Sequence, residues 1–244
     1  MTDIERLQQL IDASKRIVFF GGAGVSTESG IKDFRSVDGL YSQKYKYPPE
    51  MILHADFFWN KTKDFYDFYR EKMICDSARP NAAHKKLAEL ERAGKLSCVI
   101  TQNIDGLHTE AGSERVYELH GSVHRNRCTR CNRPYSLEHI KASGGVPVCA
   151  CGGIVKPDVV LYGEQLDSDT LDGAIRAISD SDLLIVGGTS LTVYPAAGLI
   201  SYYGGKELVL INRDVTQYDS EATLIIREPI GKTLEMIKVE PVER

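Results

Sequence analysis

Hydrophobic and polar residues alternate along the chain with two different periods. Apolar residues recur at helical spacing between Ile4 and Ile11, so the chain is predicted to open with an amphipathic helix. Further helical segments are predicted at 57–73, 81–92, 169–179, 195–203 and 231–237. Short apolar runs of strand length occur at 16–20, 96–103, 116–121, 158–164, 182–188, 207–212 and 222–228.

The alternation of strands and helices predicts the class of fold. It favours an α/β protein with a Rossmann-like, doubly wound parallel sheet that helices cover on both faces. Polar, glycine-rich stretches come directly after four of the apolar runs, at 21–27, 102–106, 187–190 and Asn212. Ligands in such sheets bind at the carboxyl ends of the strands. Four strand ends that meet at one crevice would form a dinucleotide site.

Four of the six cysteines form two close pairs, Cys128-x-x-Cys131 and Cys149-x-Cys151. Four thiolates at this spacing favour a closed, structural Zn²⁺ site, and a redox-active dithiol is the alternative. The pairs indicate a smaller inserted zinc-ribbon/helical module. We expect a Rossmann-like unit of residues 1–35, 81–121 and 155–244, and a smaller module of residues 36–80 and 122–154.

Composition and charge narrow the classes of function. Of the 244 residues 42% are hydrophobic, and the net charge is −4. Nucleic-acid and membrane binders prefer basic surfaces, so neither partner is expected. The chain has no run of about eighteen apolar residues, and its N-terminus lacks the apolar stretch of a signal peptide. We therefore expect a cytoplasmic protein. A monomer is also expected.

The stretch after the first predicted strand has features of a phosphate-binding turn. The G-A-G at 22–24 would let the backbone approach a pyrophosphate, and a helix opening there would add N–H donors. The third position of the dinucleotide fingerprint is Thr27 instead of glycine, so a plain tight turn remains the alternative. Ser26 and Thr27 add hydroxyl donors. Phe34 and Arg35 are adjacent on the following loop, where a ring and a guanidinium could cover a bound cofactor.

Two further stretches carry groups that can take part in chemistry. Gln102 and Asn103 can bind hydroxyls and Asp105 can accept from a carboxamide, although ordinary turns also use Asn, Asp and Gly. His120 lies after a short strand and before Gly121. Histidine titrates near neutrality, which suits a general base that acts on a ribose hydroxyl. A lone histidine is more often structural, so this pattern alone leaves both interpretations open.

Together these stretches resemble the sirtuin family over nearly the whole chain, from residue 15 onward. The stretches that carry the resemblance are GGAGVSTESGIKDFRS, TQNIDGLH, LHGS, the two cysteine pairs, KPDVVLYGE, GGTSLTVYP and LVLIN. In this order and spacing they are specific. The resemblance implies an NAD-dependent protein-lysine deacetylase that consumes NAD as a co-substrate and contains one structural Zn²⁺.

The resemblance also implies roles for individual residues. His120 matches the general base, and Asn103 and Asp105 belong to the catalytic pocket. Binding of NAD is implied for Gly22, Ala23, Gly24, Ser26, Thr27, Phe34, Arg35, Gln102, Asn103, Ile104, Asp105, His120, Gly188, Thr189, Ser190, Asn212 and Ile230. An acyl-lysine protein or peptide would pair as an added strand with segments that contain Val159, Val160, Tyr162, Gly163 and Val193. Zn²⁺ would bind Cys128, Cys131, Cys149 and Cys151.

The implied reaction transfers the acetyl group of lysine to ADP-ribose and releases nicotinamide. Sirtuins that prefer succinyl or malonyl lysine resemble one another in a Tyr-x-x-Arg on the helix that lines the acyl pocket. Here Tyr66 and Tyr69 occupy that stretch and Arg70 comes one position late. Because a helix turns by about 100° per residue, Arg70 should point elsewhere, and an apolar pocket that favours deacetylation is expected. The pair Cys149-x-Cys151 is tighter than usual, which leaves the zinc geometry open.

Several alternatives remain. An NAD-dependent oxidoreductase would produce NADH, although the missing third glycine counts against it. Another deacylase, such as a desuccinylase, or a protein mono-ADP-ribosyltransferase would use the same co-substrate differently. A non-catalytic zinc-ribbon module for nucleic acid would show salt-dependent DNA binding, and the acidic pI disfavours it.

Overall fold

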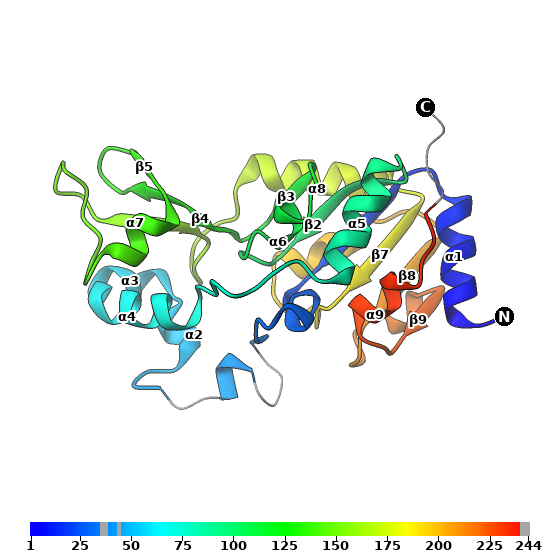
Figure 1. The fold of residues 1–244 in the computed structure, drawn as a ribbon, viewed down its shortest axis with the longest axis horizontal. Helices are drawn as coiled ribbons and strands as arrows, with labels where there is room; N and C mark the ends of the chain where they lie inside the picture. Colours follow the sequence, from blue (N-terminus) through cyan, green and yellow to red (C-terminus); the bar gives the residue numbers. More distant parts are fainter. Residues whose placement is uncertain (35–38, 43–44, 240–244) are drawn as a thin grey trace.

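The computed structural model describes residues 1–34, 39–42 and 45–239. Within these residues a six-stranded parallel sheet has the order β3-β2-β1-β7-β8-β9, and a separate three-stranded antiparallel sheet has the order β5-β4-β6 (Figure 1). The parallel strands are β1 (Ile17–Gly21), β2 (Leu96–Thr101), β3 (Val116–Glu118), β7 (Leu183–Gly187), β8 (Glu207–Ile211) and β9 (Leu224–Ile226). Counted in chain order, the strand order is that of a doubly wound dinucleotide-binding sheet, so the predicted fold class is confirmed.

Helices cover both faces of the parallel sheet. In β1, Phe19 packs into the core on the side of α1 (Asp3–Ala13), α5 (Ala82–Arg92) and α9 (Ile230–Glu235). The next residue, Phe20, packs into the opposite core with α8 (Ser168–Asp180) and the 3-10 segment η4 (Ala196–Tyr202). Successive side chains of a strand point to opposite faces. Burial on both sides therefore explains why these strands read as continuous apolar runs.

Polar caps set the start of the predicted helices. The side chain of Asn81 accepts from the N–H of Ala83 at the start of α5, and Asp167 accepts from the N–H of Thr170 at the start of α8. Each cap satisfies an amide that has no partner within its helix. The helices predicted at the N-terminus, at 81–92 and at 169–179 are confirmed. Among the described residues, none of the helices combines the length and hydrophobicity that a membrane span requires.

A smaller module lies at the opposite end of the molecule from the two termini (Figure 1). Its strands are β4 (Gly121–Cys128), β5 (Pro134–Tyr135) and β6 (Val155–Val159), and its helices are α2 (Pro49–Ile52), α3 (Ala55–Asn60), α4 (Thr62–Lys72) and α7 (Leu137–Ala142). A core of its own, separate from the two cores of the parallel sheet, fills the space between these elements. The ring of Tyr66 in α4 is fully buried, and its hydroxyl donates to the carbonyl oxygen of Val155 in β6.

Two element predictions need correction. The single helix predicted at 57–73 is two helices, because Lys61 leaves the helical region with φ −137° and ψ 47°. The break lets Phe58 of α3 and Phe65 of α4 pack edge to face, with ring centroids 5.0 Å apart. The run at 158–164 is not one strand: β6 ends at Val159 and belongs to the antiparallel sheet. The remaining elements are α6 (Leu107–Glu110) and the 3-10 turns η1 (Ala23–Val25), η2 (Thr27–Ser29), η3 (Leu40–Ser42) and η5 (Asp219–Glu221).

The sheets also bear on the division of the chain into two units. Residues 155–159 pair with β4 in the small sheet, whereas the division drawn from the sequence placed them in the larger unit. We propose the same two units with this one transfer, so that β6 counts with the smaller module.

The burial of two histidines allows us to predict how the free energy of unfolding depends on pH. The rings of His84 in α5 and His108 in α6 lie 4.6 Å apart between their centroids, and both side chains are shielded from solvent. Burial lowers the pKa of both imidazoles below the ordinary value near 6.5, so the unfolded chain binds protons more readily. We expect the free energy of unfolding to fall as the pH drops below about 6.5, by up to about 1.4 kcal/mol per pH unit for each histidine.

Urea unfolding at pH 7.5 and pH 5.0 would measure this effect, with His108→Phe as the matched variant. The phenyl ring keeps the shape of the side chain and cannot take up a proton. The variant should lose less stability between the two pH values than the wild type. An equal loss in both proteins would contradict the assignment.

Candidate active site

Four polar segments meet at the carboxyl edge of the parallel sheet. They follow β1, β2, β7 and β8, which are neighbours in the sheet. With residues of the small module they line a cavity of about 770 Å³. Many of the residues predicted to bind NAD lie in its wall: Gly22, Ala23, Gly24, Ser26, Phe34, Gln102, Asn103, Ile104, Asp105, His120, Gly188, Thr189, Ser190 and Asn212.

Two described residues of the predicted NAD set do not lie in the cavity wall. Thr27 uses its hydroxyl within the loop, where Oγ1 donates to the carbonyl oxygen of Gly24 at 2.9 Å. Ile230 is buried in the core below the sheet edge, where a Cβ on Gly187 would lie 2.3 Å from its Cδ1. Neither residue is part of the described cavity wall. Arg35 lies outside the described residues.

The glycine loop packs directly on the turn that follows β7. The N–H of Gly24 donates to the carbonyl oxygen of Gly188 at 2.8 Å, and a Cβ on Gly24 would lie 2.7 Å from the Cα of Gly188. Only glycine permits this approach of two backbones. Within residues 22–30, all of which are described, the chain forms the single 3-10 turns η1 and η2, so the α-helix expected to open here is wrong. The loop therefore offers backbone amides without the N-terminus of an α-helix behind them.

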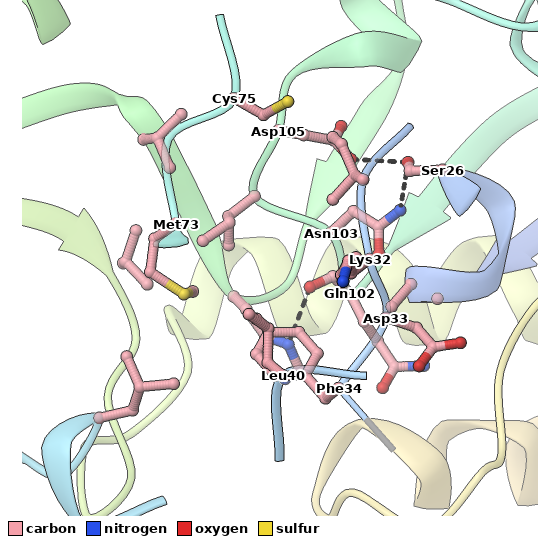
Figure 2. A pocket seen from close by; sticks show the side chains of 18 of the residues that line it. Ser26, Lys32, Asp33, Phe34, Leu40, Met73, Cys75, Gln102, Asn103 and Asp105 are labelled. Atoms are coloured by element: carbon pink, nitrogen blue, oxygen red, sulfur yellow. Dashed lines mark hydrogen bonds between the residues drawn. The ribbon is translucent and has the colours of Figure 1, made fainter. Parts of the chain in front are cut away.

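A hydrogen-bonded trio fixes the polar floor of the cavity (Figure 2). Ser26 Oγ donates to Asp105 Oδ2 at 2.6 Å, and Asn103 Nδ2 donates to Ser26 Oγ at 3.0 Å. Ser26 is only 1% exposed. The second carboxylate oxygen of Asp105 accepts from the N–H of Leu107 at the start of α6. The segment after β2 is thus tied to the glycine loop after β1, and its side chains are held in one orientation.

A second network joins three strand ends. Gln102 Nε2 donates to Thr189 Oγ1 at 2.9 Å. The backbone N–H of Thr189 donates to Asn212 Oδ1 at 3.0 Å, and Asn212 Nδ2 donates back to the carbonyl oxygen of Thr189 at 2.8 Å. The sequence placed these residues at the ends of β2, β7 and β8, and the structure brings them together.

His120 is held by its backbone and by its ring. Its Nδ1 lies 3.0 Å from the carbonyl oxygen of Gln102. A carbonyl oxygen only accepts, so Nδ1 carries the proton and Nε2 keeps a lone pair. Burial lowers the pKa of His120 below its ordinary value, and the bond to Gln102 opposes this shift in part. The ring therefore stays neutral near pH 7, with Nε2 available as a base at the cavity that His120 lines.

The residues predicted to bind a peptide lie along the same cavity. Val159, Val160, Tyr162, Gly163 and Val193 all line it. The N–H of Val160 donates to the carbonyl oxygen of His120 at 3.0 Å. Residues 159–163, which we call the peptide segment, are therefore hydrogen-bonded to His120 near their start. Further along, Tyr162 forms a parallel bridge with His54, and its hydroxyl lies 2.8 Å from that of Tyr41.

The four paired cysteines converge as the sequence predicted. Their sulfur atoms all lie within 4.8 Å of one another, with Cys128 Sγ 3.4 Å from Cys151 Sγ and Cys131 Sγ 3.6 Å from Cys149 Sγ. These separations are too long for disulfides and suit four thiolates around one Zn²⁺, with bonds of about 2.3 Å. The tight Cys149-x-Cys151 spacing is therefore compatible with a closed set. His124 is not part of it, because its Nε2 lies 3.0 Å from the carbonyl oxygen of Asp105.

One wall of the cavity was not predicted. The segment between α4 and α5 contributes Met73, Ile74 and Cys75, and Val123 and Leu137 face it from β4 and α7. Figure 2 shows Met73 and Cys75 across the cavity from Ser26 and Gln102. Residues 73–79 have no regular period and no motif. These residues reach the site because the small module lies beside the parallel sheet, and this arrangement depends on the whole fold.

A family model and proteins of known function match the sequence of this chain. The model of the Sir2 family matches residues 22–195. An NAD-dependent protein deacetylase of Clostridium acetobutylicum is 58% identical over 238 residues, which cover 96% of this chain and 97% of that protein. An NAD-dependent protein deacetylase of Staphylococcus aureus is 42% identical and covers 98% of this chain and 99% of its own length.

Solved Sir2 structures also superimpose on this chain. A Sir2 structure with a p53 peptide and NAD⁺ superimposes with a TM-score of 0.84 at 40% identity, and 96% of each chain is covered. The structure of Sir2Tm bound to a propionylated peptide also gives a TM-score of 0.84, at 38% identity and 96% coverage of each chain.

Proposed function

This chain belongs to the Sir2 family, and we infer that it is an NAD-dependent protein deacetylase that removes acetyl groups from lysine side chains. One observation carries the residue-level proposal. Nδ1 of His120 donates to the carbonyl oxygen of Gln102, on the side of the glycine loop, and the backbone carbonyl oxygen of His120 accepts from the N–H of Val160, on the side of the peptide segment. A base at this junction can act where NAD and an acyl-lysine would meet.

The proposed reaction consumes NAD. The acetyl oxygen of the lysine attacks C1′ of the nicotinamide ribose, and nicotinamide leaves. His120 then takes a proton from a ribose hydroxyl, whose oxygen attacks the carbon of the acetyl group. Addition of water yields free lysine and O-acetyl-ADP-ribose. Asn103 and Asp105, fixed by Ser26, would orient the nicotinamide and its ribose, and the amides of the glycine loop would bind the pyrophosphate.

Mass spectrometry tests the proposed function. An acetyl-lysine peptide is incubated with the zinc-loaded protein, with and without NAD. Loss of the acetyl group only with NAD, together with nicotinamide and O-acetyl-ADP-ribose, is the expected result. ADP-ribose on the protein or peptide, or formation of NADH, would overturn it in favour of a transferase or an oxidoreductase.

The surroundings of α4 predict the preferred acyl group. Arg70 Nε donates to the carbonyl oxygen of Ile140 at 2.9 Å and a second nitrogen bonds that of Gly145, so the guanidinium faces α7 and is not in the described cavity wall. Leaving a buried carboxylate unpaired costs about 3 kcal/mol. We therefore expect kcat/KM for an acetyl-lysine peptide to exceed that for the matched succinyl-lysine peptide by about 100-fold or more.

Parallel assays of the two peptides measure this preference, and a propionyl-lysine peptide serves as an uncharged control of larger size. Four lysine and arginine side chains lie in the described cavity wall. Lys72 contacts Glu71 at 2.8 Å and Arg79 donates to backbone carbonyl oxygens, so both already have partners. Lys32 and Arg213 belong to the segments after β1 and β8 instead of the α4 region. Faster removal of succinyl than of acetyl would contradict the assignment of the α4 residues.

We also propose that the protein acts as a monomer in the cytoplasm on acyl-lysine segments of other proteins, without a nucleic-acid or membrane partner. The support is the net charge of −4 and the segment at 159–163, which lines the cavity beside His120. Light scattering on the purified protein tests the monomer, and a DNA-binding assay at low salt tests the absence of nucleic-acid binding.

A further inference from the structure

The strand that follows His120 has an unusual register. In β4, Ser122 pairs with Asp158 and Asn126 pairs with Pro157, which are adjacent in β6. Residues 123–125 therefore bulge out of the pairing. A bulge of this kind redirects side chains and is common beside active sites.

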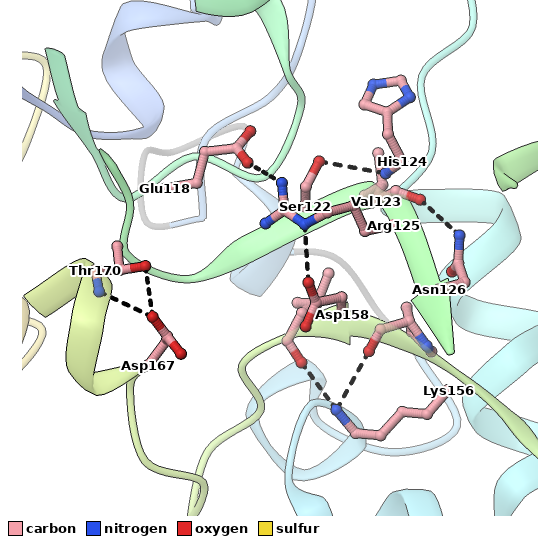
Figure 3. Close-up of polar contacts among 12 residues, drawn as sticks. Glu118, Ser122, Val123, His124, Arg125, Asn126, Lys156, Asp158, Asp167 and Thr170 are labelled. Carbon is pink, nitrogen blue, oxygen red and sulfur yellow. Dashed lines mark hydrogen bonds and ion pairs between the residues drawn. The ribbon is translucent and has the colours of Figure 1, made fainter. Parts of the chain in front are cut away.

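All three residues of this bulge contact segments around the site. The N–H of Val123 donates to the carbonyl oxygen of Ile104 at 3.0 Å, and His124 contacts the carbonyl oxygen of Asp105. Arg125 Nε donates to Asp158 Oδ2 at 2.8 Å, and its Nη1 donates to Glu118 Oε2 (Figure 3). The bulge thus connects the segment after β2, the end of β3 and the start of the peptide segment.

Arg125 acts on both sides of His120. Glu118 lies two residues before the histidine at the end of β3, and its side chain is only 12% exposed. Asp158 lies against Gly121, directly after the histidine: a Cβ on Gly121, at φ +76°, would meet the carbonyl oxygen of Asp158 at 1.8 Å. A shift of Asp158 would therefore displace the backbone on which His120 is mounted, together with Val159 and Val160.

We propose that Arg125 is a positioning residue, which sets His120 and the peptide segment relative to each other through its two ion pairs with Glu118 and Asp158. The guanidinium fork suits two carboxylates at once, which a lysine ammonium does not. Without Arg125, both carboxylates would lose the cation that they share. The inference rests on the proposed function, because it concerns the same base and the same peptide segment. Neither Arg125 nor Asp158 is part of the described cavity wall, so both act through other residues.

The test compares Arg125→Met with Arg127→Met. Arg127 lies on the same strand and is exposed. Its replacement by methionine removes the same charge as Arg125→Met and therefore serves as the control. For Arg125→Met we expect kcat/KM for the acetyl-lysine peptide to fall by about 10- to 100-fold, since small misplacements of reacting groups cost this much. We expect KM for NAD to change less than about twofold, because Arg125, Glu118 and Asp158 have no hydrogen bond or ion pair to the glycine loop at 22–27. Arg125→Lys should recover only part of the loss.

Asp158→Asn provides a second, milder variant that keeps the shape of the side chain. If both residues act through one contact, the double variant Arg125→Met/Asp158→Asn should be no slower than the worse single variant. Equal kinetics for Arg125→Met and Arg127→Met would overturn the proposal. So would parallel losses for peptide and NAD that follow a lowered melting temperature. Failure of the wild type to deacetylate the peptide would instead refute the proposed function, so the two failures are distinguishable.

Discussion

Replacing His120 with alanine is expected to lower kcat for deacetylation by about 10²- to 10⁴-fold, the usual contribution of a general base. The bond between Nδ1 and the carbonyl oxygen of Gln102 leaves Nε2 as the only basic atom of this ring. Alanine removes that atom and leaves the backbone contacts in place. Steady-state kinetics with an acetyl-lysine peptide and saturating NAD measure the effect, and calorimetric titration with NAD checks that the co-substrate still binds.

The pH dependence of the wild type provides an independent check on His120. A base works only when unprotonated, so kcat should fall on the acid side of its pKa. Burial lowers the pKa of His120, and the acid limb should therefore lie below about pH 6.5, with little change between pH 7 and pH 8. His139→Ala, in α7 of the small module, is the matched histidine control. Comparable rates for the two variants would exclude His120 as the base.

The parts of this site that were predictable share a local cause. A buried strand needs an apolar run, and the turn after it needs glycine or polar residues, so the ends of β1, β2, β7 and β8 are visible in the sequence. Parallel strands end at the same edge, which places Gln102, Thr189 and Asn212 together without further information. The cysteine pairs are equally local, because ligand spacing is set by the chain between them.

The parts that were missed depend on contacts between distant segments. The glycine loop was expected to open an α-helix, but Ser26 is bonded to Asp105, which is 79 residues away, and the loop forms single 3-10 turns. The bulge at 123–125 exists only because β4 pairs with β6 on one side and contacts the segment after β2 on the other. Local propensity carries no information about contacts between segments that are distant in the sequence, so these features could not be predicted from the sequence alone.

Loss of zinc is expected to unfold the small module and abolish activity. The four cysteines close the end of a module whose core lies between β4, β6 and the helices α3 and α4. Zinc binding in structural sites contributes about 10–16 kcal/mol, which matches or exceeds the whole stability of a typical domain, about 5–15 kcal/mol. Cys128→Ser should therefore abolish zinc binding and lower the melting temperature sharply. Because β4 begins at Gly121, directly after His120, disorder in the module would reach the base itself.

Zinc content by atomic absorption and thermal unfolding by circular dichroism measure the two effects. The control is Cys75→Ser, outside the cluster, which should retain one zinc per chain and an unchanged melting temperature. A zinc-free protein that melted and deacetylated like the wild type would show that the cysteines pack the module without needing the metal.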